Sequence, residues 1–121
     1  MSSTTKITVT IDCEDPEALA AFWARFVGYR VQPRRPGSPY VIAERPEGFD
    51  GPAMLTFQQV PEPKTTKARV HLDLLVDHAR PMVDQMLEAG ATLDSVEEAG
   101  AWTTRVLRDP AGNELCVIGP D

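Results

Sequence analysis

The chain has 121 residues, of which 42% are hydrophobic and 25% charged. This length suits one soluble domain and excludes a second independent core. The 18 acidic and 12 basic residues give a formal net charge of −6. Because that is the wrong sign for a phosphate-binding surface, the composition excludes nucleic acid as a partner.

The two cysteines, Cys13 and Cys116, are too few for a disulfide framework and lack the paired spacing of a zinc motif. We expect both to be reduced thiols. Residues 1–10 hold no apolar stretch of signal-peptide length, and no segment approaches the roughly 20 apolar residues of a membrane span. The sequence therefore predicts a cytoplasmic protein with no membrane partner.

The first half of the chain is typical of a strand followed by a helix. Apolar and polar residues alternate along residues 7–13, the period of a strand with one buried face. Asp15 and Pro16 suit a helix N-cap and first position. Large apolar residues follow at i, i+3, i+4 and i+7, namely Leu19, Phe22, Trp23 and Phe26. Gly28 ends the predicted helix, and short strands are expected near residues 29–32, 40–44 and 53–60.

The second half repeats this order about 62 to 63 residues later. We expect a strand over residues 70–76, followed by a helix with Asp77 as its N-cap and Gly90 at its end. Further strands are expected near residues 92–96, 102–108 and 114–118. The pattern predicts an α+β fold of two βαβββ modules, residues 6–60 and 68–119, with a polar connector at 61–67. Helices on one face of each sheet leave the other face free to curve around a ligand or a second sheet.

Three segments carry a resemblance to a known family. They are Asp12-Cys13-Glu14-Asp15-Pro16 leading into Ala21-Phe22-Trp23, the strand Val70-His71-Leu72-Asp73-Leu74, and the turn Asp109-Pro110-Ala111-Gly112-Asn113 before the last strand. Together with the repeat, they resemble the vicinal oxygen chelate (VOC) superfamily, and within it the glyoxalase-like and bleomycin-resistance-like proteins.

The resemblance spans residues 6–119 and implies one domain over residues 1–121, with paired modules that form a curved open barrel. This is the glyoxalase/bleomycin resistance/dihydroxybiphenyl dioxygenase fold. Members are often dimeric and hold their ligand on the concave side, so the resemblance implies a homodimer and a small-molecule ligand.

Catalytic members hold one divalent metal through four side chains, and the resemblance places those positions at Thr8, Phe57, His71 and Cys116. Only His71 is a good match. One imidazole and one thiol fall short of the three protein donors of a stable zinc site. We therefore expect no metal or other cofactor, and the alternative is one divalent metal bound through His71.

Seven residues are the candidate site. His71, Asp73 and Glu114 are candidate catalytic residues, since each is expected on the polar face of its strand and one imidazole with a carboxylate suffices for acid/base work. Thr8, Phe57, Trp102 and Cys116 are candidate ligand-binding residues. Plainer alternatives stay open: a hydrogen-bonded cavity histidine, a small buried thiol, and aromatic rings packed in the core.

The alternation predicts that His71 projects into the concave cavity with Thr8, Asp73, Glu114 and Cys116. Arg34, Arg35 and Arg45 fall in loops, where they either rim that cavity and meet an anion or are simply solvated.

Two functions remain open. The first is the binding of a small organic ligand without the family's metal, a role that the net charge of −6 would suit if the ligand is cationic. The second is a lyase or isomerase of the glyoxalase type, either metal-free with His71 as acid/base or with a metal bound through His71.

Overall fold

The computed structural model describes residues 6–121. The prediction that residues 1–10 hold no signal peptide therefore falls partly outside the described residues. The chain divides into two compact units, a first that ends at Pro63 and a second that runs from Lys64 to Asp121. None of the helices in residues 6–121 is long and apolar enough to cross a membrane.

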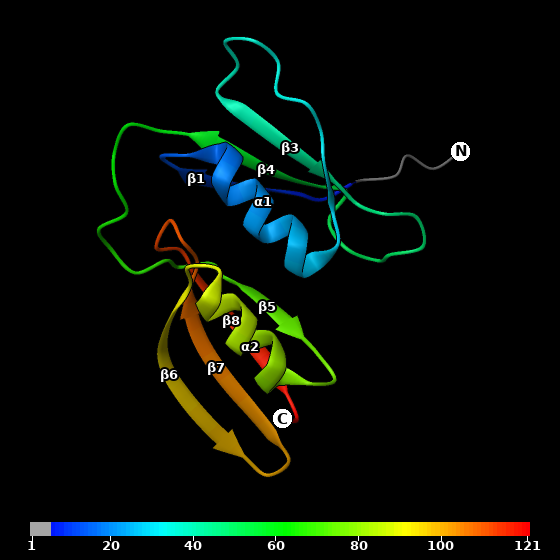
Figure 1. The fold of residues 1–121 in the computed structure, drawn as a ribbon, viewed down its shortest axis with the longest axis vertical. Helices are drawn as coiled ribbons and strands as arrows, with labels where there is room; N and C mark the ends of the chain where they lie inside the picture. The colour runs from blue at the N-terminus through cyan, green and yellow to red at the C-terminus, as the bar shows by residue number, and fades with distance from the viewer. Residues whose placement is uncertain (1–5) are drawn as a thin grey trace. The chain divides into compact units, whose positions relative to one another are not determined.

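The first unit is a βαβββ module with one helix on one face of a mixed sheet (Figure 1). Its sheet has the order β1-β4-β3-β2, in which β1 and β4 are parallel and the other neighbours antiparallel. The elements are β1 (Thr8–Cys13), α1 (Pro16–Val27), β2 (Arg30–Val31), β3 (Tyr40–Glu44) and β4 (Met54–Gln59).

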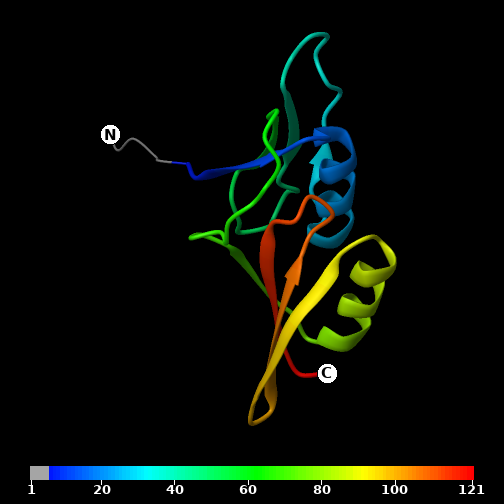
Figure 2. The same ribbon diagram turned by 90° about the vertical axis from the view of Figure 1, so that its left-hand side faces the viewer.

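The second unit has the same topology, with the sheet order β5-β8-β7-β6 and a parallel β5–β8 pair. Its elements are β5 (Leu72–Leu75), α2 (Ala79–Glu88), β6 (Thr92–Ala99), β7 (Trp102–Arg108) and β8 (Glu114–Gly119). Figure 2 shows α1 and α2 each against one face of their own sheet. The α+β class and the two βαβββ modules are confirmed.

Helix α1 begins and ends where the sequence predicts. The Asp15 carboxylate accepts a hydrogen bond from the Ala18 N–H, Pro16 takes the first helical position, and Gly28 closes the helix at φ 77°. Only a residue without a Cβ adopts that left-handed geometry at little cost. The helix buries its apolar stripe, with Leu19 and Trp23 almost fully enclosed against the sheet.

Helix α2 corrects the predicted cap. His78, not Asp77, is the N-cap residue, and its side chain makes no capping hydrogen bond. The Ala79 N–H donates instead to the Pro120 carbonyl at 2.8 Å, so the backbone after β8 satisfies a group that a capping side chain would otherwise serve. Val70 and Ile7, expected in the two cores, are 84% and 70% exposed because they precede β5 and β1.

The strand register separates two faces in each sheet. In the first sheet, Val41, Leu55 and Phe57 are buried and share the face that α1 covers. In the second, Leu107, Leu115 and Val117 are the buried set beneath α2. Residues of opposite parity point to the helix-free side, which we call the open face of each sheet.

Candidate functional site

Three candidate residues come together on the open face of the second sheet. Asp73 on β5 is the register partner of Cys116 on β8, and His71 lies two residues before Asp73. The Nδ1 atom of His71 is 2.8 Å from Asp73 Oδ1 and 3.9 Å from Cys116 Sγ. One ligating atom from each residue lies within 4.8 Å of the others. We call these three residues the His71 cluster.

The contact between His71 and Asp73 determines what the imidazole can do. When Nδ1 carries the proton, it donates to the Asp73 carboxylate and leaves Nε2 as the proton acceptor. The two side chains are 40% and 48% exposed, so a ligand on the open face can reach them. The cluster therefore offers an oriented general base that is open to solvent.

Cys116 is a neutral member of the cluster. Burial raises the pKa of its thiol above the ordinary value, and the neighbouring Asp73 carboxylate raises it further. Because the thiolate is the nucleophilic form, this setting disfavours nucleophilic chemistry at Cys116 near neutral pH.

Glu114 lies on the same face but is committed to other contacts. Its Oε1 is 2.7 Å from Lys64 Nζ, and its Oε2 accepts a hydrogen bond from the Ala68 N–H at 3.1 Å. The Lys64 ammonium is the main cause that lowers the pKa of Glu114 to about 2, and the Ala68 N–H adds to it against the opposing effect of burial. These contacts favour a structural role, and we remove Glu114 from the acid/base candidates.

Sequence reasoning missed Lys64, which belongs to a polar connector with no motif.

Phe57 belongs to the core and not to the open face. Its side chain is fully buried, and its register partners Ile11 and Val41 point toward α1. The repeat of 63 residues equates Thr10 with Asp73, and Thr10 pairs with Thr56 as Asp73 pairs with Cys116. Thr56 is therefore the structural equivalent of Cys116. The alignment was one residue out, and core packing is the role that the structure gives Phe57.

The remaining two candidates are exposed. Thr8 lies on the open face of the first sheet beside its register partner Met54. Trp102 is 51% exposed and shares the open face of the second sheet with Val106, the partner of Cys116. Val106 is four positions beyond Trp102 along the strand, roughly 13 Å away, so Trp102 does not join the His71 cluster.

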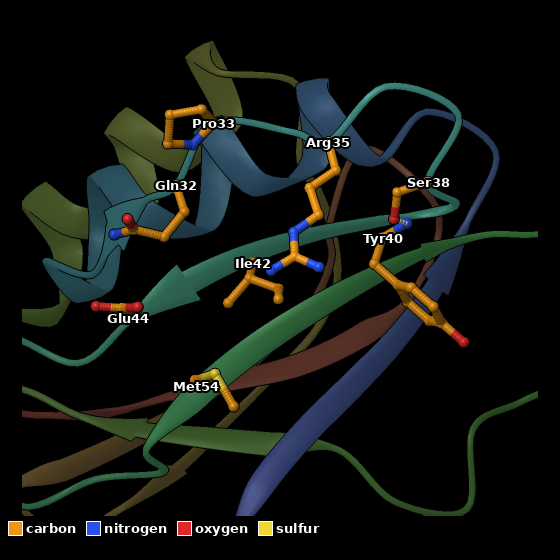
Figure 3. Close-up of a pocket in the computed structure, with 8 residues that line it drawn as sticks. All are labelled: Gln32, Pro33, Arg35, Ser38, Tyr40, Ile42, Glu44 and Met54. Carbon is orange, nitrogen blue, oxygen red and sulfur yellow. Dashed lines mark hydrogen bonds between the residues drawn. The ribbon is translucent and has the colours of Figure 1, made fainter.

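The first unit contains a pocket of about 590 Å³ on its open face (Figure 3). The lining side chains come from the loop after β2 and from β3 and β4: Gln32, Pro33, Arg35, Ser38, Tyr40, Ile42, Glu44 and Met54. Figure 3 shows the Arg35 side chain extended from the loop over Ile42, with Glu44 and Gln32 toward one end and Tyr40 and Ser38 toward the other. The sequence pattern did not predict this pocket, because a loop forms one of its walls.

The four metal positions that the resemblance implies do not form a metal site in this chain. Thr8 offers only a neutral hydroxyl, and so does Thr56, which replaces Phe57 as the structural equivalent of Cys116. The His71 cluster is a different donor set, because Asp73 adds a carboxylate to the imidazole and the thiol. Three such donors meet the minimum for a zinc-type ion and suit it better than magnesium, which prefers oxygen ligands.

Comparison with known proteins agrees with this architecture. The family model described as "Glyoxalase-like domain" matches residues 8–118. No curated protein sequence matches the chain significantly.

Solved structures with this fold include a glyoxalase/bleomycin resistance protein/dioxygenase family enzyme from Burkholderia phytofirmans PsJN. The two sequences are 22% identical, the TM-score is 0.72, and the match covers 94% of this chain and 97% of that one. TnmS3, an antibiotic binding protein from Streptomyces sp. CB03234, has 20% identity, TM-score 0.67, and coverage of 100% and 99%. Lactoylglutathione lyase from Agrobacterium tumefaciens has 16% identity, TM-score 0.62, and coverage of 98% and 96%. With the paired βαβββ modules and the match over residues 8–118, the chain belongs to the glyoxalase-like family of the VOC superfamily.

Proposed function

We propose that this protein binds a small organic molecule in the pocket on the open face of its first sheet, and that binding needs no metal. The observation that carries the proposal is the pocket itself. Its volume of about 590 Å³ falls within the range of small-molecule sites, roughly 300–1,000 Å³. Its lining combines an apolar floor with a few polar groups, which is the usual composition of such sites. TnmS3, described as an antibiotic binding protein, has the same fold and supports a binding role.

A pocket-filling substitution tests this proposal. Ile42→Trp places an indole in the pocket, whereas Thr10→Trp adds the same ring on the same face at a residue that does not line it. A fragment library is screened by ligand-observed NMR against the wild type and both variants. We expect hits that Ile42→Trp abolishes and Thr10→Trp retains. A library with no hits, or hits that Ile42→Trp leaves intact, would refute binding in this pocket.

The second candidate function is metal-free acid/base catalysis at His71, as in a lyase or isomerase. The 2.8 Å contact between His71 and Asp73 favours it, because it fixes the ring and leaves Nε2 free to take a proton. Asp73 would then be a positioning residue. Lactoylglutathione lyase from Agrobacterium tumefaciens shares the fold, so lyase chemistry is compatible with the scaffold.

The metal-dependent form of this candidate rests on the His71 cluster. His71, Asp73 and Cys116 would hold a zinc-type ion, which supplies Lewis acidity to a bound substrate. We propose that the protein as purified holds no stoichiometric metal, since His71 Nδ1 and Asp73 Oδ1, two of the three possible donor atoms, are paired with each other at 2.8 Å. Elemental analysis of wild type and of His71→Ala tests this. One ion per chain, lost in His71→Ala, would favour the enzyme over the metal-free binding protein.

We further propose one domain that comprises both modules, a homodimer as the working state, and a cytoplasmic location. The family match over residues 8–118 supports the single domain. The thiols of Cys13 and Cys116 suit a reducing compartment. Sheets with unpaired edge strands favour association with a second copy. Light scattering that finds only monomer at micromolar concentration would contradict the dimer.

A further inference from the structure

The three loop arginines differ in what they contact, and the difference identifies a candidate recognition group. Arg34 is fully engaged: it is 3.2 Å from Glu17 Oε1, and it donates to the Ser38 carbonyl at 2.9 Å and to Gln59 Oε1 at 2.8 Å. These contacts tie the loop after β2 to the first turn of α1 and to the end of β4. Arg34 therefore has a structural role and holds the wall of the pocket in place.

Arg45 is also structural, because it donates to the Gly51 carbonyl at 2.9 Å within its own loop. Arg35 differs from both. It is exposed and lines the pocket, and its side chain takes part in none of the ion pairs or hydrogen bonds of residues 6–121, although its backbone carbonyl accepts a hydrogen bond from the Ser38 N–H. Its guanidinium extends over the pocket floor (Figure 3). A cation on a fixed loop, aimed across an apolar floor, is a group available to a ligand.

The floor and far end of the pocket supply the other requirements. Tyr40, Ile42 and Glu44 alternate along β3, so their side chains rise from the same face about 7 Å apart. Met54 is the register partner of Glu44 and extends the apolar surface from Ile42. Glu44 takes part in no ion pair of residues 6–121, although it lines the same pocket as Arg35. The pocket therefore has a cationic group above an apolar floor and a carboxylate at one end.

We propose that the ligand of this pocket is an organic anion with an apolar, ring-sized body and a hydrogen-bond donor at its far end. This rests on the proposed function and names the chemical class of the ligand. The anionic group, a carboxylate in the simplest case, binds the Arg35 guanidinium, whose paired N–H groups match two carboxylate oxygens. The body packs on Ile42 and Met54, and an amine or hydroxyl donates to Glu44, which when ionised only accepts hydrogen bonds.

This assignment replaces the cationic ligand that the net charge of −6 would suit. Net charge acts at long range and is screened beyond about 8 Å at physiological ionic strength, whereas contacts inside a pocket are local. The local charges are one guanidinium and one carboxylate. A ligand with a single positive charge would satisfy Glu44 and leave Arg35 without a partner.

Four small probes of matched shape test the proposal by amide-detected NMR titration of the full chain: benzoate, benzylamine, benzyl alcohol and 4-(aminomethyl)benzoate. Each is titrated into the wild type, Arg35→Gln, Glu44→Gln and the control Arg25→Gln. The control removes an equal charge from α1, on the opposite side of the same sheet. All three substituted side chains are exposed, so the amide spectra should remain those of a folded protein.

We expect benzoate to shift the amides of residues 32–44 and Met54 at millimolar concentration and to bind more tightly than benzyl alcohol or benzylamine. Arg35→Gln should weaken benzoate about tenfold, the value of one charge-assisted contact, and Arg25→Gln should change it by less than about twofold. 4-(Aminomethyl)benzoate should bind more tightly than benzoate, and Glu44→Gln should remove that gain.

Two results would overturn the inference in distinguishable ways. If benzyl alcohol or benzylamine binds these amides as well as benzoate does, and Arg35→Gln has no effect, the pocket is a small-molecule site but its ligand is not an anion. If no probe perturbs these amides, both the ligand class and the proposed site in the first unit are wrong.

Discussion

Substitution of Lys64 by methionine should expose the role of the Lys64–Glu114 ion pair. The Glu114 side chain is 5% exposed and that of Lys64 is 17% exposed, so the pair lies largely out of water. The pKa of Glu114 falls from 4.5 to about 2 on folding. A shift of this size corresponds to at most about 3 kcal/mol of stability at neutral pH. Lys64→Met leaves the buried carboxylate with backbone N–H donors and no cation, so we expect a loss of about 2–3 kcal/mol.

The pH dependence of this loss follows from the direction of the shift. Because the folded pKa is depressed, the stabilisation is fully present above pH 4.5 and is lost as the pH falls toward 2. The difference in unfolding free energy between wild type and Lys64→Met should therefore fall to less than half its neutral value by about pH 3. Urea denaturation at pH 7, 5 and 3 measures it.

Two controls make this experiment decisive. Lys67→Met removes an exposed lysine from the same segment and should change stability by less than about 0.5 kcal/mol. Lys64→Met combined with Glu114→Met removes both charges and should recover most of the stability. Arg108, the strand partner of Glu114, keeps its own contact with Asp94 at 2.8 Å in all of these variants. A loss that is absent at pH 7, or that does not change with pH, would refute the role assigned to the pair.

Three further substitutions test the assigned faces and the backbone. Gly119→Ala should prevent stable folding, because the new Cβ would lie 2.1 Å from the Val76 carbonyl oxygen. Gly100→Ala meets open space and should cost only about 1 kcal/mol, because the φ of Gly100 is 65°. Thermal unfolding compares the two variants. Phe57→Ala should cost about 3–5 kcal/mol as a core truncation, and a fully stable variant would contradict the core assignment. His71→Ala should cost less than about 1 kcal/mol because its side chain is 40% exposed, and chemical denaturation that shows a larger loss would make His71 a structural residue.

The sequence predicted the regular elements because their periods differ clearly. The helical stripe with Leu19 and Trp23 and the alternation along β1 each fit one geometry only, and Asp15, Pro16 and Gly28 mark the ends of α1. The second helix was less certain at its start, since a carbonyl from Pro120 serves its first turn. Such a contact joins residues about 40 positions apart and leaves no local pattern.

The sequence predicts which face of a strand is buried only where the apolar residues occupy every second position. In β5, Leu72 and Leu74 determine the buried side, and Asp73 must then point away. In β4, Met54, Leu55 and Phe57 put apolar side chains on both faces, so the alternation does not determine which face is buried. The pairing of Phe57 with Ile11 resolves this, and that pairing is a tertiary fact that no local window contains.

The two modules share a scaffold but differ on their open faces, and the strand register shows where the difference lies. Asp73 and Cys116 of the second module correspond to Thr10 and Thr56 of the first. A hydroxyl pair neither titrates near neutral pH nor binds a divalent ion strongly, so at these equivalent positions only the second module has the residue types that acid/base or metal chemistry uses. The first module has instead the loop after β2, which forms one wall of a pocket and is held in place by the contacts of Arg34. The register thus places the imidazole–carboxylate pair in the second module and the pocket in the first, as a division between proton transfer and ligand binding would require.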